Sequence, residues 1–295
     1  MSYDLYFCRR DGPVPSIPEL KEYFSAAPFF QVRDVAEGGV EFWYRNEATG
    51  VYCSFSYSPL DAKELEGCGS SGLSFNLNFI RPNFFAYETM PLVEAFCEHF
   101  NLIVEDSQEE TVGSANALQL INSWRSHNMQ AMGAMMDFAK QEDMELHYLP
   151  EERATEWWRY MKVRQAIEQE LTEDIFVPEV MILKSPTKDL FTMIVWPNGI
   201  AQFFPSCDYV YVQRQKRRLF GMREELGLVR YQSVLDTINP LLDRYQFGGL
   251  GIKYLRPDYT QRVSPLIQTL TLEPIDLAQH SRVASDGFHD VELPK

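Results

Sequence analysis

The segment from Leu73 to Phe79 constrains the fold of this chain most strongly. It alternates Leu or Phe with Ser or Asn over seven residues. Successive side chains of a β-strand point to opposite faces, so the large apolar side chains share one face and the small polar ones share the other. The sequence therefore predicts a strand with one buried face and one face turned to solvent or to a partner.

The residues around this strand predict an α+β domain over residues 1–110. Ser16 and Glu19 have the spacing of a capping box and predict a helix that ends near residue 27. Thr89 followed by Pro91 predicts a second helix start, with the helix continuing to Phe100. Further strands are expected at residues 3–8, 29–35, 40–44, 51–57 and 102–104.

The acidic run from Glu105 to Glu110 predicts a domain boundary. Residues 111–172 contain two amphipathic helical patterns and are expected to form a helical connector. Strand patterns then predict a meander within a second α+β domain, followed by a helix over residues 231–245 that Pro240 kinks or divides. The predicted fold class is α+β, with two α+β domains of mainly antiparallel sheets joined by a helical segment. The expected domains are residues 1–110 and 173–283, and residues 284–295 are expected to form a poorly anchored tail.

Charge and hydropathy limit the partners of the chain. Its 295 residues include 42 acidic and 27 basic side chains, a net charge of −15, and residues 1–110 alone have a net charge of −11. Such a field repels phosphate backbones, so we expect no direct nucleic-acid partner. No apolar run has the length of a membrane span, so no membrane partner is expected, and the first residues lack a signal-peptide pattern. A cytoplasmic location is predicted.

The cysteines and histidines do not predict a metal site. The five cysteines are an odd number without a CxxC pair, which indicates free thiols in a reducing compartment. They are Cys8, Cys53, Cys68, Cys97 and Cys207. The five histidines lack the spacings that bring two ligands to one helix face, so neither a metal nor a cofactor is predicted.

No motif predicts catalysis. The GxGxxG string from Gly67 to Gly72 precedes a strand, whereas a dinucleotide-binding loop precedes a helix, so a flexible loop is favoured. Cys207 could act as a nucleophile only with a distant histidine, and a small apolar thiol is the favoured interpretation. His147, close to several acids, is interpreted as part of a charge-rich loop end rather than as an acid–base group.

A basic run stands out in this acidic chain. It could bind an anion or an acidic patch of a partner, although such runs are more often solvated helices or loops. Its members are Arg214, Lys216, Arg217, Arg218 and Arg223.

Several segments together resemble a group of bacterial proteins that are often encoded beside polymorphic toxins and interpreted as immunity proteins. The resemblance is strongest over residues 1–107, and the second domain resembles the usual companion of that first domain through residues 177–179 and 205–209. The matching segments of the first domain are residues 2–7, 42–44, 51–52, 75–78, 81–85 and 91–100.

The resemblance implies a cytosolic protein that binds and neutralises a secreted toxin of the type VI or Rhs kind. The cognate toxin domain is expected to have a cationic active-site surface, to which an acidic domain would be steered. The resemblance brings no catalytic motif, so no catalytic residue is assigned and no enzymatic activity is expected. Two alternatives stay open: a hydrolase-type enzyme that acts in an interdomain cleft to reverse toxin damage, and a secretion-system adaptor.

Two segments are candidate partner contacts. The first is a loop expected after Arg81-Pro82, where the aromatic side chains of Phe84, Phe85 and Tyr87 could anchor a partner. The alternative for the two phenylalanines is that they cap the hydrophobic core. The acidic run supplies the second candidate surface, for which a solvated linker is the alternative. Its candidate contact residues are Glu105, Asp106, Glu109 and Glu110.

Overall fold

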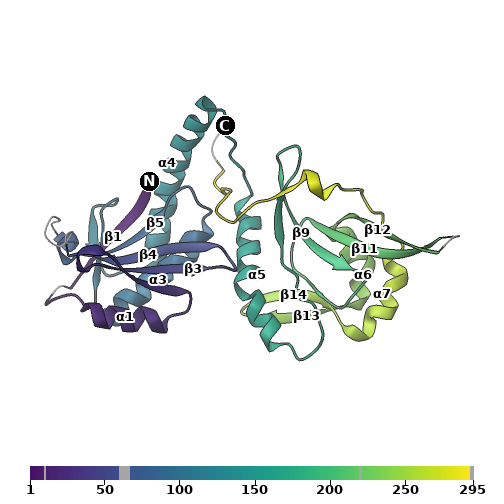
Figure 1. The fold of residues 1–295 in the computed structure, drawn as a ribbon, viewed down its shortest axis with the longest axis horizontal. Coiled ribbons are helices and arrows are strands. Elements are labelled where there is room, and N and C mark those ends of the chain that lie inside the picture. The colour runs from purple at the N-terminus through teal and green to yellow at the C-terminus, as the bar shows by residue number, and fades with distance from the viewer. Residues whose placement is uncertain (10, 60–66, 219–220, 293–295) are drawn as a thin grey trace. The chain divides into compact units, whose positions relative to one another are not determined.

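The computed structural model describes residues 1–9, 11–59, 67–218 and 221–292 (Figure 1). The chain divides into two compact units: unit 1 is Met1–Leu146 with Phe288–Lys295, and unit 2 is His147–Gly287. The predicted α+β class with mainly antiparallel sheets is confirmed. The expected connector at residues 111–172 is not a separate part of the fold: residues 111–146 belong to unit 1 and residues 147–172 to unit 2. Within the described ranges, no helix combines the length and apolar content needed to cross a bilayer.

Unit 1 is built on a seven-stranded antiparallel sheet. Its strands lie in the order β2-β3-β4-β5-β1-β6-β7. They are β1 Ser2–Cys8, β2 Phe30–Asp34, β3 Val40–Asn46, β4 Val51–Tyr57, β5 Leu73–Asn78, β6 Ile103–Asp106 and β7 Thr111–Gly113. The predicted strand at residues 73–79 is β5, and its Leu and Phe side chains are buried while its Ser and Asn side chains are partly exposed. The same alternation in β1 and β4 gives the sheet one apolar face.

Helices α1 (Ile17–Ala26) and α3 (Phe84–Phe100) cover this apolar face. The ring centroid of Phe24 in α1 lies 4.3 Å from the ring centroid of Phe42 and 5.0 Å from that of Phe55, both in the sheet. Phe96 of α3 lies 5.4 Å from the same Phe24 ring. Fully burying each Phe contributes about 1.5–3 kcal/mol, so this aromatic cluster holds helices and sheet together. The predicted capping box at Ser16 and Glu19 is present at the start of α1.

Helix α3 begins earlier than predicted. It starts at Phe84 and encloses Pro91, whereas the sequence places the start at Pro91. The cap comes from a distant part of the chain: the carboxylate oxygens of Asp290 accept the backbone N–H of Asn83 at 3.0 and 2.9 Å. A negative charge at a helix N-terminus also interacts favourably with the helix dipole. The sequence around residue 84 contains no sign of this cap, because its donor and acceptor lie 207 residues apart.

The C-terminal segment is anchored to unit 1. Phe288 is 4% exposed and packs against Phe84 with ring centroids 6.3 Å apart, while Asp290 is 2% exposed. The expectation of a poorly anchored tail over residues 284–295 is therefore wrong for residues 288–291.

Unit 2 contains helix α5 (Glu151–Glu170) and two sheets. The five-stranded sheet has the order β12-β11-β9-β8-β15, and the three-stranded sheet has the order β10-β14-β13. The strands are β8 Met181–Lys184, β9 Leu190–Pro197, β10 Phe203–Phe204, β11 Tyr209–Arg218, β12 Gly221–Arg230, β13 Leu242–Phe247, β14 Leu250–Leu255 and β15 Ser281–Arg282. Helices α6 (Tyr231–Ile238) and α7 (Thr260–Ile267) complete the unit.

Two sequence predictions for unit 2 are wrong. The strands do not form a simple meander, because β10 joins the second sheet and β9 pairs with β11 in parallel. The predicted helix over residues 231–245 ends at Ile238, next to a 3-10 turn that contains Pro240. The division at Pro240 is correct, but β13 follows it, since pairing with β14 supplies backbone partners that a local pattern does not reveal.

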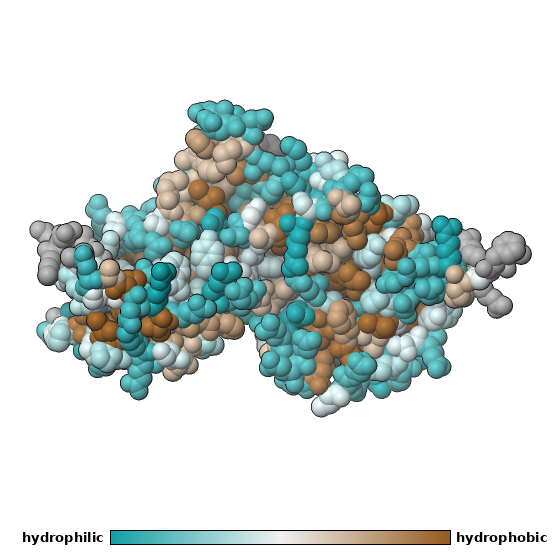
Figure 2. Space-filling view, viewed as in Figure 1, coloured by the Kyte–Doolittle hydropathy of each residue, from teal (hydrophilic) through white to brown (hydrophobic). Residues whose placement is uncertain are grey.

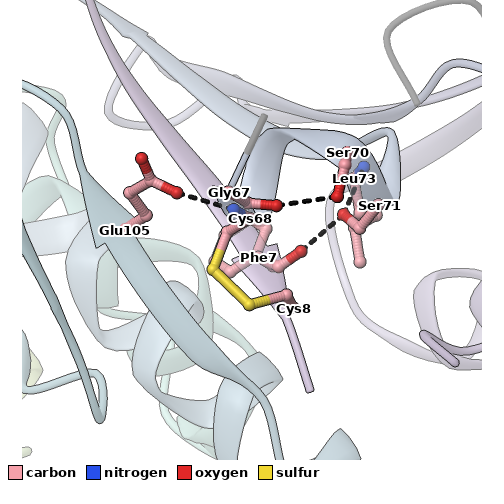
Figure 3. Close-up of a disulfide and its surroundings, with 8 residues drawn as sticks. All are labelled: Phe7, Cys8, Gly67, Cys68, Ser70, Ser71, Leu73 and Glu105. Atoms are coloured by element: carbon pink, nitrogen blue, oxygen red, sulfur yellow. Dashed lines mark hydrogen bonds between the residues drawn. A yellow bond between two sulfur atoms is a disulfide. The ribbon is translucent and has the colours of Figure 1, made fainter. Parts of the chain in front are cut away.

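The prediction that all five cysteines are free is also wrong. Cys8 at the end of β1 forms a disulfide with Cys68 in the 3-10 turn Gly67–Ser71 (Figure 3). Cys53, Cys97 and Cys207 are free. Burial raises the pKa of Cys97 to about 12 and also raises that of Cys53, so both thiols stay protonated at neutral pH. Because disulfides are rare in the cytosol, the cysteines no longer support a cytoplasmic location, which stays a prediction.

Replacing both bonded cysteines, in a Cys8→Ser/Cys68→Ser variant, should lower the free energy of unfolding by about 2–4 kcal/mol, because the bond closes a long loop in the unfolded chain. Urea denaturation with and without dithiothreitol measures this effect. The reductant should destabilise the parent chain to the same extent and leave the variant unchanged. Equal stability of all four samples would contradict the assignment of the disulfide.

Replacing Asp290 with Ala should destabilise unit 1 by about 1–2 kcal/mol, because the variant loses the cap of α3 and its interaction with the dipole. Glu292→Ala is the matched control, since it removes the same charge from an exposed position of the same segment. Thermal unfolding followed by circular dichroism should separate the two variants; equal Tm values would show that Asp290 does not cap the helix.

Candidate functional site

A pocket of about 690 Å³ lies in unit 1, between the β6–β7 hairpin and the first turns of helix α4 (Ala117–Gln141). Two acidic residues, Asp106 and Glu109, line it together with Asn116, Gln119 and Asn122. The pocket therefore offers negative charge and hydrogen-bonding groups in a unit that is itself strongly acidic.

Local structure fixes both sides of this pocket. On the hairpin, Asp106 Oδ1 accepts the backbone N–H groups of Gln108 at 3.0 Å and Glu109 at 3.3 Å, which closes the turn after β6. On the helix, Asn116 is the N-cap of α4, and its Oδ1 accepts the backbone N–H of Gln119 at 3.0 Å. Asp and Asn favour these positions because their short side chains reach nearby backbone amides.

A buried hydrogen-bond network holds the Asp106 carboxylate in place. The hydroxyl of Tyr3, a fully buried residue of β1, donates to Asp106 Oδ2, and Ser123 of α4 donates to the same oxygen at 2.8 Å. Burial, followed by the hydrogen bond to Asp106, raises the pKa of Tyr3 well above its usual range. The phenol consequently stays neutral and acts as a hydrogen-bond donor to Asp106.

Glu109 and His127 lie at the more exposed side of the network. Glu109 Oε1 lies 3.6 Å from His127 Nδ1 and 3.4 Å from Ser123 Oγ, and the Glu109 side chain is 44% exposed. His127 Nδ1 is also 3.0 Å from the backbone oxygen of Ser123. A carbonyl oxygen only accepts hydrogen bonds, so Nδ1 carries the proton and is not a base for the Ser123 hydroxyl. The geometry differs from that of a serine–histidine–acid triad, in which the histidine accepts the serine proton.

The structure places Phe84 and Phe85 in the core. Both are fully buried in the first turn of α3, so the expected loop is absent and neither ring is available as a surface anchor. Tyr87 is half-buried, and the guanidinium of Arg125 lies 5.7 Å from its ring centroid. A partner contact by the two phenylalanines would require them to leave the core.

The acidic run is strand and turn rather than a linker. Asp106 and Glu109 meet at the pocket, whereas Glu110 is exposed at the turn with a φ of 53°. Glu105 Oε2 accepts the backbone N–H of Cys68 at 2.7 Å and so holds the 3-10 turn of the disulfide (Figure 3). The predicted strand after Gly72 is confirmed, so this GxGxxG string leads into β5.

The basic run lies in strands β11 and β12, not in a solvated helix or loop. Arg214 is 5% exposed and donates to the backbone oxygens of Ile267 and Leu270 at 2.7 and 2.9 Å, and to Glu225 at 2.9 Å. Lys216 Nζ lies 3.5 Å from the same Glu225 carboxylate. The side chains of Arg217 and Arg218 lie outside the described part of the structure.

The Cys207 thiol is hydrogen-bonded to the backbone. Burial raises the pKa of the Cys207 thiol, which donates to the backbone oxygen of Tyr209 at 3.3 Å. Among the described residues, no group of three or more His, Cys, Asp and Glu side chains could hold a metal ion.

No sequence pattern marks Tyr3, Ser123 or His127 as a site residue. Tyr3 alternates with the apolar side chains of β1 and resembles a core residue, while Ser123 and His127 have no motif around them. Tyr3 and Ser123 are 120 residues apart, so only the folded chain joins them.

No protein-family model, curated protein or solved structure matches this chain. The resemblance to immunity proteins therefore stays a prediction.

Replacing Tyr3 with Phe should lower the free energy of unfolding by about 1–3 kcal/mol, since Asp106 loses one of its buried donors. Tyr57→Phe is the matched control on β4, because its hydroxyl has no hydrogen-bond partner among the described residues. Urea denaturation measures both variants, and a loss of the same size in the control would contradict this role of the Tyr3 hydroxyl.

Proposed function

We propose that this chain is an immunity protein that binds a cognate toxin domain through unit 1 and blocks the toxin's cationic active site. The observation that carries the proposal is the pocket of Asp106 and Glu109 in a unit with 24 acidic and 10 basic side chains, a formal charge of −14. An Arg or Lys side chain of the toxin would enter this pocket.

The pocket is suited to a cationic side chain because its deeper charge is held in place beforehand. Asp106 is fixed by Tyr3, Ser123 and the hairpin amides, so binding does not have to order it. Glu109 is more exposed and is accessible to the incoming charge at the rim of the pocket. Charge-assisted hydrogen bonds of this kind are about twice as strong as neutral ones. The field of unit 1 would also accelerate encounter with a cationic partner.

Exposed apolar residues near the pocket supply the rest of an interface. Val112, which lines the pocket, is 60% exposed, and Leu118 of α4 is 67% exposed. Figure 2 shows further hydrophobic residues along α4 below its hydrophilic tip, and Met129 of this helix is about half exposed. Apolar side chains around a charged anchor exclude water from it. Blocking an active site requires only a complementary surface of about 800 Å² per partner.

Co-expression with the toxin encoded by the neighbouring gene tests this proposal. The parent chain should restore survival and co-purify with the toxin at a one-to-one ratio. Glu109→Lys should weaken binding at least about tenfold, because it places a cation at the rim of the pocket. Glu110→Lys is the matched control, since it changes the same charge at the next residue, which does not line the pocket. Its affinity should stay within about threefold of the parent.

Two results would overturn the proposal. One is the absence of binding and of rescue by the parent chain at both low and moderate salt. The other is an equal loss of affinity in Glu109→Lys and Glu110→Lys, which would assign the effect to the overall charge and not to the pocket.

A further inference from the structure

A second pocket, of about 260 Å³, lies in unit 2 between α5 and the β13–β14 hairpin. Three cationic side chains from three different elements line it: Arg159 from α5, Arg244 from β13 and Lys253 from β14. Cations that are far apart in the sequence therefore converge on one small cavity. The positive charge of this pocket is opposite to the negative charge of the pocket in unit 1.

The two arginines of this pocket differ from most others in unit 2. Ten arginines of this unit have described side chains, and seven of them have a carboxylate, carbonyl or aromatic partner. These seven are Arg153, Arg164, Arg214, Arg230, Arg256, Arg262 and Arg282. Arg159 and Arg244 have no such partner among the described residues, and neither has Arg223 on β12. The fold therefore leaves two guanidinium groups available at the cavity.

The other residues that line the pocket are apolar or already form hydrogen bonds within the protein. Tyr160, Phe204 and Ile252 are buried and line one side of the cavity. Glu156 is the one carboxylate among the lining residues, and it accepts a hydrogen bond from Ser206 at 2.9 Å. Three cations against one carboxylate leave a net charge of +2 at the pocket.

We propose that this pocket binds the phosphate group of a small phosphate monoester. A phosphate dianion balances the net charge, and its oxygens match the planar fork of donors that each guanidinium presents. The apolar wall would contact the organic part of the ligand, and a volume of about 260 Å³ limits that part to a small group. The site lies in unit 2, whose 18 acidic and 17 basic side chains nearly balance, so no strong field repels an anion.

Calorimetric titration of the full chain with inorganic phosphate, phenyl phosphate and benzoate tests the proposal. Phenyl phosphate should bind most tightly, because it combines the dianion with an apolar group, and benzoate should bind more weakly than phenyl phosphate. Arg159→Gln and Arg244→Gln should each weaken phenyl phosphate binding about tenfold or more. Arg223→Gln is the matched control: it removes the same charge from the same unit, outside the pocket, and should leave the affinity unchanged.

Glu156→Gln provides a test of opposite sign. The amide oxygen can still accept from Ser206, but the negative charge is gone, so phenyl phosphate should bind more tightly. The proposal fails if no saturable binding of phenyl phosphate occurs up to about 10 mM. It also fails if benzoate binds as tightly, if Glu156→Gln weakens binding, or if Arg223→Gln weakens it as much as Arg244→Gln. None of these results depends on the toxin, so they are independent of the test of the immunity function.

Discussion

One-sided burial of the sheet in unit 1 is the constraint on which the rest of that unit depends. Alternation in β1, β4 and β5 directs the large apolar side chains to one face, where Phe24 of α1 and Phe96 of α3 complete an aromatic cluster. Helix α4 in turn packs against α3. The opposite face keeps small polar residues such as Ser74 and Asn76, whose side chains are partly exposed.

Unit 1 contains two buried carboxylates with similar hydrogen-bond networks, Glu88 on helix α3 and Asp106 on strand β6. Glu88 is 3% exposed and accepts hydrogen bonds from Tyr44, Asn46 and Thr49, so its charge is compensated inside the core. Asp106 is equally well supplied with donors but lies on β6, near the sheet edge, where it borders a pocket. Leaving a buried charge without donors would cost several kcal/mol, and both networks offset that cost. Asp106 combines that network with a position in the lining of the unit 1 pocket.

The charge of the chain is divided between the units in a way that the net value of −15 conceals. Nearly all of it belongs to unit 1, where it surrounds an acidic pocket, whereas unit 2 is close to neutral and contains a cationic one. The two proposals follow from this division. Unit 1 would attract a cationic macromolecule over long range, and unit 2 would bind a small anion through short-range contacts.

The sequence alone determined the features that depend on neighbours within a few residues. Alternation predicted β5, the Ser16–Glu19 spacing predicted the start of α1, and composition predicted an acidic first third within an α+β fold. Only the tertiary structure decided which distant groups meet. Tyr3 joins Asp106 across 103 residues, Cys8 joins Cys68 across 60, and Asp290 caps α3 across 207. Secondary-structure patterns arise from local backbone geometry, whereas these pairs form because folding brings distant segments together, and local periodicity contains no record of that.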